Sequence, residues 1–114
     1  MIVFKSLAAA ALLLVVATAA TPVFAADAPP GDPAAGKEVF NGTCSHCHGP
    51  NAVVEERRIN LRRLHKKYGD EMDQVFLTTV NEGRPAKGMP TWKAVFKPQD
   101  FANILAYLKT LQEQ

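Results

Sequence analysis

Five consecutive residues near the middle of the chain, Cys44 to His48, constrain its fold more than any other segment. The thiols of Cys44 and Cys47 are three residues apart, so on a helical turn both point to one side and can form thioethers with the two vinyl groups of one porphyrin edge. His48 follows directly and can bind iron through one ring nitrogen, while its other N–H donates to an acceptor such as a backbone carbonyl. The motif therefore predicts one covalently attached c-type haem.

Three other uses of these residues are weaker. A disulfide between Cys44 and Cys47, the only two cysteines, would close a short and strained loop. A zinc site would need a fourth ligand besides these thiols and His48, and the nearest candidate, His65, lies in a basic run. A thiol oxidoreductase would use the pair as a dithiol, but the sequence has no thioredoxin-like βαβ pattern.

The N-terminus has the pattern of an export signal. Lys5 is the only charged residue in the first 26, an apolar run covers Leu7 to Ala20, and Val23 and Ala25 occupy the minus-three and minus-one positions of a cleavage site. We therefore expect cleavage after Ala25 and a periplasmic location. The alternative is an uncleaved membrane anchor, because the apolar stretch is near the lower limit of about 17 to 20 residues for a spanning helix.

This pattern divides the chain into a signal peptide at 1–25, a flexible Pro-rich leader at 26–31 and one small domain at 32–114. Lys and Arg number 13 against 11 Asp and Glu, which gives a formal net charge of +2. This balance provides no reason to expect a nucleic-acid partner. We expect a monomer that meets redox protein partners through small, transient interfaces.

The basic residues are unevenly distributed. Six of them fall between positions 57 and 67, namely Arg57, Arg58, Arg62, Arg63, Lys66 and Lys67. Such a run can be a docking patch for an acidic partner or a cover for haem propionates, or it can be a solvated helix face. The sequence favours the solvated face.

The first predicted helix begins at Asp32, whose side chain can cap free N–H groups, and runs to about Thr43. Gly36 and Phe40 are one turn apart and therefore share a face. A glycine there costs up to ~1 kcal/mol of helix propensity, which suggests that another backbone passes close by.

After the motif we expect a loop over 51–59, then helices over 60–69, over 70–83 and from Pro98 onward. Asn60 is placed to cap the first of these three. Their apolar positions follow the helical repeat: Leu61, Leu64, Tyr68, Met72, Val75, Phe76, Thr79, Val80, Phe101, Ile104, Leu105, Leu108 and Leu111.

Residues 83–90 are rich in Gly and Pro and are predicted to form a loop. Met89 in this loop is the best candidate for a sixth iron ligand, because it is a soft thioether on a stiffened segment. Its competitors are Met72, whose helical spacing is typical of core, and His65, which is typical of an exposed residue on a basic helix. Trp92 could cover a haem edge or anchor the loop in the core, and both interpretations stay open.

In their order, these features resemble a class I cytochrome c: Gly36 and Phe40, the motif Cys44 to His48, the loop Gly88-Met89-Pro90, and a terminal helix with Tyr107. The resemblance covers the whole mature chain and implies an all-α fold of about four short helices around one haem. It implies that Cys44 and Cys47 form the thioethers. It also implies that His48 and Met89 are the axial ligands, and that Gly36 and Phe40 face Tyr107 where the first and last helices cross.

One feature departs from this family. Many members have a proline after the motif whose carbonyl accepts the N–H of the axial histidine, and here no proline lies between Pro50 and Pro85. We expect the segment Ile59-Asn60-Leu61 to occupy that place. The compact middle and the ending from Met89 to Trp92 are similar to small bacterial cytochromes that take electrons from quinoprotein alcohol dehydrogenases.

The predicted function is therefore periplasmic electron transfer, from a dehydrogenase to a terminal oxidase or another cytochrome, by a protein that is not itself an enzyme. With both axial positions filled, iron changes its oxidation state without binding a substrate. The alternative is a haem c ligand-binding sensor or a peroxidase-like enzyme. Either would need an open sixth position, so ligation by Met89 separates the two interpretations.

Overall fold

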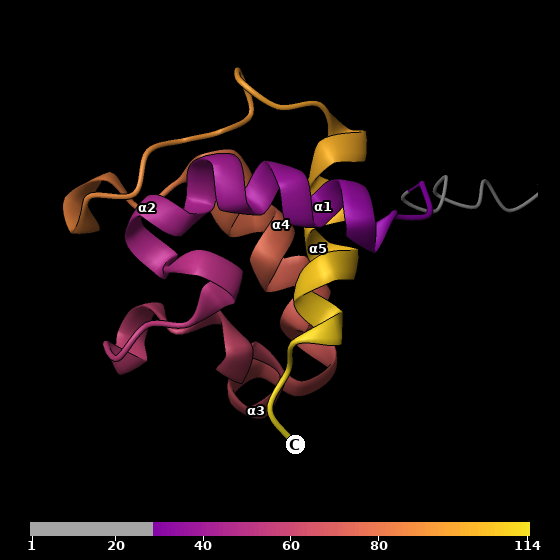
Figure 1. Cartoon of the computed structure of the whole chain (residues 1–114). Coiled ribbons are helices and arrows are strands. Elements are labelled where there is room, and N and C mark those ends of the chain that lie inside the picture. Colours follow the sequence, from indigo (N-terminus) through magenta and orange to yellow (C-terminus); the bar gives the residue numbers. More distant parts are fainter. Residues whose placement is uncertain (1–28) are drawn as a thin grey trace, which may run out of the picture.

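The computed structural model describes residues 29–114, and this part of the chain is helical, which confirms the all-α prediction (Figure 1). Its α-helices are α1 (Pro33–Val39), α2 (Ser45–His48), α3 (Leu64–Tyr68), α4 (Met72–Glu82) and α5 (Pro98–Thr110). Short turns connect them: η1 (Phe40–Cys44), η2 (Pro50–Ala52), η3 (Arg57–Ile59), η4 (Leu61–Arg63), η5 (Gly69–Glu71) and η6 (Pro85–Lys87). The predicted signal peptide, 1–25, lies outside the described residues. Within 29–114, no helix has the length and apolar character needed to cross a membrane.

The elements α1, η1 and α2 form one helical rod over 33–48. Asp32 begins it, because its side-chain oxygen accepts the N–H of Ala34 at 2.9 Å. The helix was predicted to end at about Thr43, but the observed helical backbone continues through the motif to His48. It does so because η1 is a π-helical turn that keeps the backbone right-handed. Gly49 then ends the rod with φ 77°, a conformation that favours glycine.

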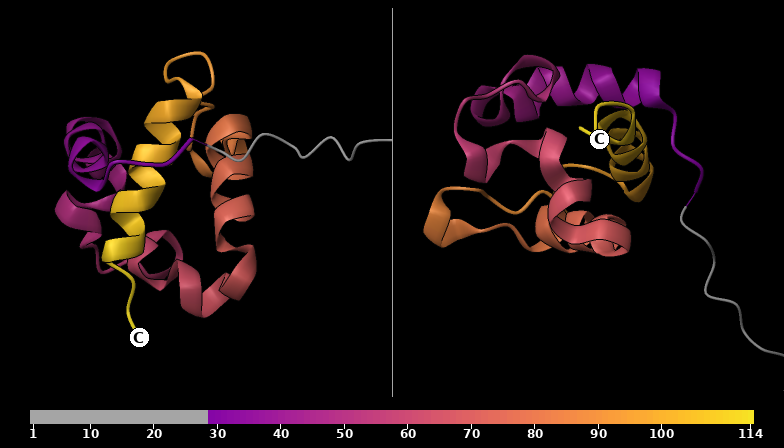
Figure 2. Two further views of the ribbon diagram at one scale, coloured as in Figure 1. Left: turned by 90° about the vertical axis from the view of Figure 1, so that its right-hand side faces the viewer. Right: turned by 90° about the horizontal axis from the view of Figure 1, so that it is seen from below.

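The rod crosses α5, as expected from the sequence (Figures 1 and 2). A Cβ atom on Gly36 would lie 1.9 Å from the carbonyl oxygen of Asn103, so the two backbones touch at this glycine. One turn later the fully buried ring of Phe40 packs on Tyr107, with 5.8 Å between ring centroids. The predicted crossing contact is therefore confirmed. Gly31, the last residue of the predicted leader, also lies against α5, because its Cβ would meet the carbonyl of Ala102.

The core is built from the predicted stripes of the last two long helices. Helix α4 contributes Met72, Phe76 and Val80, and α5 contributes Phe101, Ile104, Leu105, Tyr107 and Leu108. Helix α4 ends at Gly83 with φ 69°. The predicted end of α4 at Gly83 and the predicted start of α5 at Pro98 agree with the structure, because each has a strong stop or start signal. The predicted start at Asp70 is two residues early, because residues 69–71 form the 3-10 turn η5 before α4 begins at Met72.

The middle of the chain contains short turns. Residues 51–59, predicted as loop, form only the single turns η2 and η3. Asn60 caps the following turn as predicted, because its Oδ1 accepts the N–H of Arg62 at 3.0 Å. The C-terminal segment holds this region in place: the side chain of Gln112 donates to the carbonyl of Leu61 at 2.8 Å.

Candidate haem site

The two thiols lie at the end of the helical rod, one turn apart. Cys44 ends η1 and is half-buried against the core, whereas Cys47 is exposed on α2. Both are free thiols, so they do not form the disulfide that the sequence left as an alternative. Burial raises the pKa of Cys44 to about 11, so the thiol is protonated at neutral pH and is a weak nucleophile.

The imidazole of His48 is held by a backbone carbonyl. Its Nδ1 lies 2.7 Å from the carbonyl oxygen of Ile59. A carbonyl oxygen only accepts, so Nδ1 carries the proton and Nε2 keeps its lone pair for a metal. The structure thus confirms that the segment Ile59-Asn60-Leu61 takes the place of the missing proline.

Met89 lies on a loop that closes on itself. Arg84 and Met89 exchange two backbone hydrogen bonds, 2.8 and 3.1 Å long, and Gly88 between them adopts φ 83°. The loop then returns to α4, where the N–H of Trp92 donates to the carbonyl of Val80 at 2.9 Å. Met89 is half-buried and packs against the core. In the right-hand view of Figure 2, this loop and α2 lie at the same end of the molecule, on opposite sides of it.

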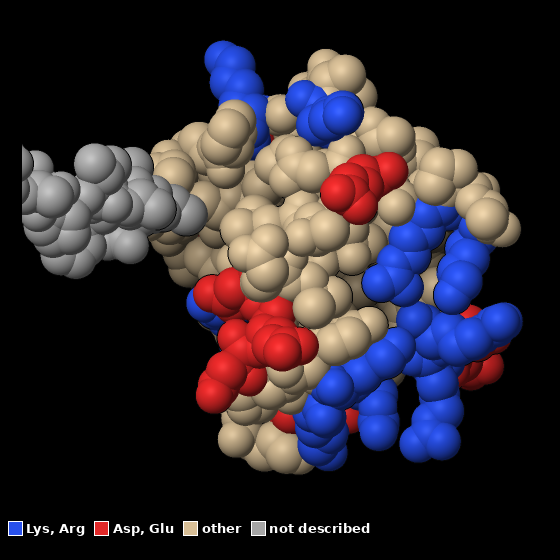
Figure 3. All heavy atoms as spheres, turned by 180° about the vertical axis from the view of Figure 1, so that it is seen from behind, with Lys and Arg blue, Asp and Glu red and all other residues tan. Residues whose placement is uncertain are grey.

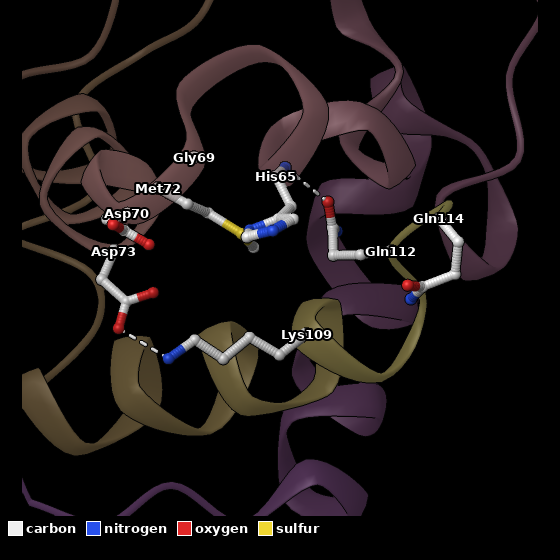
Figure 4. Close-up of a pocket in the computed structure, with 8 residues that line it drawn as sticks. All are labelled: His65, Gly69, Asp70, Met72, Asp73, Lys109, Gln112 and Gln114. Atoms are coloured by element: carbon white, nitrogen blue, oxygen red, sulfur yellow. Dashed lines mark hydrogen bonds and ion pairs between the residues drawn. The ribbon is translucent and has the colours of Figure 1, made fainter.

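The two rival ligands lie elsewhere. Met72 is buried in the core, with only 4 % of its surface exposed, and His65 is exposed on α3. Both line a surface pocket whose other walls come from η5, the end of α5 and the C-terminal residues (Figure 4). In this pocket Lys109 pairs with Asp73 at 2.6 Å. The structure therefore agrees with the assignment of Met72 to the core and of His65 to the surface.

Trp92 anchors its loop. Its ring lies 5.8 Å from that of Phe96, which in turn lies 6.2 Å from the buried ring of Phe101. The side chain is half-buried against the core. Of the two interpretations left open, the structure supports the anchor.

These residues fit a c-type haem. Two free thiols stand at the spacing for thioether bonds, one imidazole presents Nε2, and one thioether is carried on a braced loop. Nitrogen and thioether donors suit haem iron. Within residues 29–114 no group of three or more His, Cys, Asp or Glu side chains is arranged to hold a metal ion.

Sequence analysis missed two residues beside the motif. Asn51 has φ 52° and lies in the segment predicted only as loop; its side-chain oxygen accepts the hydroxyl of Tyr107 at 2.8 Å. Arg62 was grouped with the basic run, yet its guanidinium donates to the backbone carbonyl of Asn51. One sequence signal could have found Asn51: an asparagine directly after Gly49 and Pro50 is typical of a tight turn, because asparagine tolerates a left-handed conformation.

The sequence of the chain matches one protein family and is similar to several known proteins. Residues 31–108 match the family model described as cytochrome C oxidase, cbb3-type, subunit III. The chain is similar to a cytochrome c6 of Picosynechococcus sp., with 32% identity over 77% of this chain and 76% of the relative. It is also similar to a cytochrome c of Ginkgo biloba, with 28% identity over 77% of this chain and 96% of the relative.

A third relative is an enzyme. The quinohemoprotein alcohol dehydrogenase ADH-IIG of Pseudomonas putida is 36% identical over 74 residues, which are 65% of this chain. The chain spans only 10% of the length of that dehydrogenase, so the likeness concerns one part of it. No solved structure matches the chain.

Proposed function

Because this chain belongs to the class I cytochromes c, which carry one covalently bound haem c, we propose that it is a periplasmic carrier of single electrons. The observation that carries the proposal is the His48 ring. Its Nδ1 is engaged by the carbonyl of Ile59 at 2.7 Å, beside two free thiols at thioether spacing. The haem, when bound, supplies an iron that exchanges one electron between its ferrous and ferric states.

Each site residue has one proposed role. Cys44 and Cys47 anchor the porphyrin edge through thioether bonds, and His48 supplies the fifth ligand through Nε2. Met89 supplies the sixth ligand, supported by its position on a loop braced by Arg84. With His48 and Met89 both holding the iron, no position on it would remain open to a substrate, so the protein would transfer electrons without catalysing a reaction by itself.

The proposed donor is a periplasmic dehydrogenase, and the proposed acceptor is a terminal oxidase or another cytochrome. The likeness to part of a quinohemoprotein alcohol dehydrogenase supports the donor, and the family description, which names an oxidase subunit, supports the acceptor. Contact with either is proposed to be transient, by a monomer. Export by residues 1–25, with cleavage after Ala25, places the carrier in the periplasm.

The proposal is tested by absorption spectra of the exported protein, oxidised and then reduced, with Met89→Ala beside it. We expect a low-spin c-type spectrum and a weak near-infrared band of ferric iron bound to sulphur, and we expect that band to vanish in the variant. Met72→Leu is the matched control, because it removes a core sulphur at nearly constant volume and should keep the band. The mass of the same protein reports both signal cleavage and haem attachment.

Two outcomes would contradict the proposal. If the measured mass of the exported protein does not include a haem, the protein is not a haem-based electron carrier. A high-spin spectrum that does not respond to Met89→Ala would keep the haem but indicate an open sixth position, as in a ligand-binding sensor or a peroxidase-like enzyme.

A further inference from the structure

Two short segments beside the motif are joined at matching positions. His48 is bonded to the carbonyl of Ile59, and three residues further along each segment Asn51 is bonded to Arg62. Both pairs are separated by 11 residues in sequence. Residues 48–51 and 59–62 are therefore linked by one side-chain contact at each end.

The contact between Arg62 and Asn51 is specific in shape. Nε and Nη2 of Arg62 both donate to the carbonyl oxygen of Asn51, at 3.1 and 2.9 Å. A planar guanidinium presents two neighbouring N–H groups in a fixed fork, which a lysine ammonium cannot do. Arg62 is also half-buried, unlike the exposed Arg57 and Arg58 of the same basic run.

Asn51 is a fixed point for this contact. Its backbone N–H donates to the side chain of Asn41 at 2.9 Å, and its side-chain oxygen accepts the hydroxyl of the buried Tyr107 at 2.8 Å. These bonds tie it to both crossing helices. The carbonyl that Arg62 holds therefore belongs to a residue that is itself bonded to η1 and to α5.

Ile59 has less support of its own. It ends the single turn η3, where its N–H donates to the carbonyl of Glu56 at 3.2 Å, and the residues before it are exposed. The support comes from the residues that follow Ile59 in the sequence. The side chain of Arg62 is bonded to Asn51, and the backbone carbonyl of Arg62 accepts the N–H of Glu113 at 2.8 Å. The position of the Ile59 carbonyl thus depends on the residues that follow it.

We propose that Arg62 is a positioning residue for electron transfer: by holding the carbonyl of Asn51, it keeps the carbonyl of Ile59 on Nδ1 of His48. The inference rests on the proposed function, in which His48 ligates the iron. A carbonyl on Nδ1–H makes the imidazole a stronger donor, and a stronger donor favours the ferric state. Loosening the Ile59 carbonyl therefore raises the reduction potential.

The test uses the reduced holoprotein and its Arg62→Lys variant, which keeps the charge and loses the two-donor fork. NMR follows solvent exchange of the Nδ1 proton of His48. We expect this exchange to become about tenfold faster, as for loss of a hydrogen bond from a charged group. The potential should become more positive. Arg57→Lys, an exposed neighbour in the same run, should change neither quantity.

Equal exchange rates and equal potentials in Arg62→Lys and the unaltered protein would overturn the role of Arg62. If that variant yields no folded holoprotein, Tyr107→Phe provides the second test, since it removes the bond between Asn51 and α5 and leaves both the Asn41 bond and Arg62 in place. It should accelerate the same exchange by about twofold or more, and no acceleration would again overturn the inference. The absorption spectrum of the unaltered protein reports separately on the carrier function, so the two failures are distinguishable.

Discussion

Gly36 and Gly42 lie on the same helical rod but meet different surroundings. A Cβ on Gly36 would lie 1.9 Å from the carbonyl oxygen of Asn103, within the backbone of α5. A Cβ on Gly42 would meet nothing within 4 Å. The first glycine therefore permits the helix crossing, whereas the second contributes only its own backbone flexibility.

Gly36→Ala should lower the free energy of unfolding of the holoprotein by about 1–3 kcal/mol, because the helices must separate to admit a methyl group. Gly42→Ala is the matched control and should be neutral or stabilising by up to about 1 kcal/mol. Denaturant unfolding curves of both variants measure the difference. Equal effects at the two positions would refute the close crossing.

At the scale of elements, the loop that carries Met89 depends on one backbone conformation. The loop closes by two hydrogen bonds between Arg84 and Met89, and Gly88 makes the closure possible with φ 83° and ψ 7°. A Cβ on Gly88 would meet nothing within 4 Å, so only the conformation, and not the space, demands glycine. The geometry of the proposed sixth ligand therefore rests on a left-handed residue.

Gly88→Ala should weaken ligation of the iron by Met89, because the left-handed backbone conformation costs alanine about 1–2 kcal/mol. Imidazole competes with Met89 for the iron, so the sulphur band should disappear during a titration with imidazole. In the variant this should occur at a roughly tenfold lower imidazole concentration than in the unaltered protein, the factor that corresponds to about 1.4 kcal/mol. Gly88→Asn should remain closer to the unaltered protein, since asparagine tolerates this conformation. Identical titrations for alanine and glycine would contradict the argument.

At the scale of the whole molecule, charge is unevenly spread. In Figure 3 the largest group of Lys and Arg side chains covers the lower right of the face, and the largest group of Asp and Glu side chains lies at the left, with smaller groups of both signs elsewhere. Within the basic run, Arg57, Arg58, Lys66 and Lys67 are exposed, whereas Arg62 and Arg63 are half-buried. The ammonium of Lys67, which lies 5.1 Å from the centroid of the Tyr68 ring, lowers the pKa of the Tyr68 hydroxyl below its ordinary value. The exposed part of the run is thus available to an acidic partner.

Arg57→Glu combined with Lys66→Glu should slow electron transfer from the proposed donor, a periplasmic dehydrogenase, about threefold or more at low salt and hardly at all at high salt, because screening removes the steering. Stopped-flow reduction at several ionic strengths measures this. The control makes the same charge change at two exposed lysines outside the run, Lys37 and Lys93. If the double variant keeps both the electron-transfer rate and the salt dependence of the unaltered protein, the basic run is a solvated helix face and not a docking site.

The crossing of the first and last helices was implied by the family resemblance. The sequence alone determined the haem motif, the helical class and the close approach of another backbone at Gly36. These follow from local chemistry: two thiols and an imidazole at fixed spacing, apolar stripes with helical period, and a glycine beside Phe40 on one face. Each signal lies within a few neighbouring residues. The family then followed from the order of these signals along the chain.

Only the tertiary structure decided what surrounds the motif. The partner of His48 is a carbonyl, which every residue carries, so the family resemblance could indicate only the segment Ile59-Asn60-Leu61, and the structure decided for Ile59 within it. Arg62 had the same sequence signal as its solvated neighbours and differs from them only through its bond to Asn51. Both contacts join residues 11 positions apart, across a loop without periodicity, and their geometry depends on how the chain packs against α5.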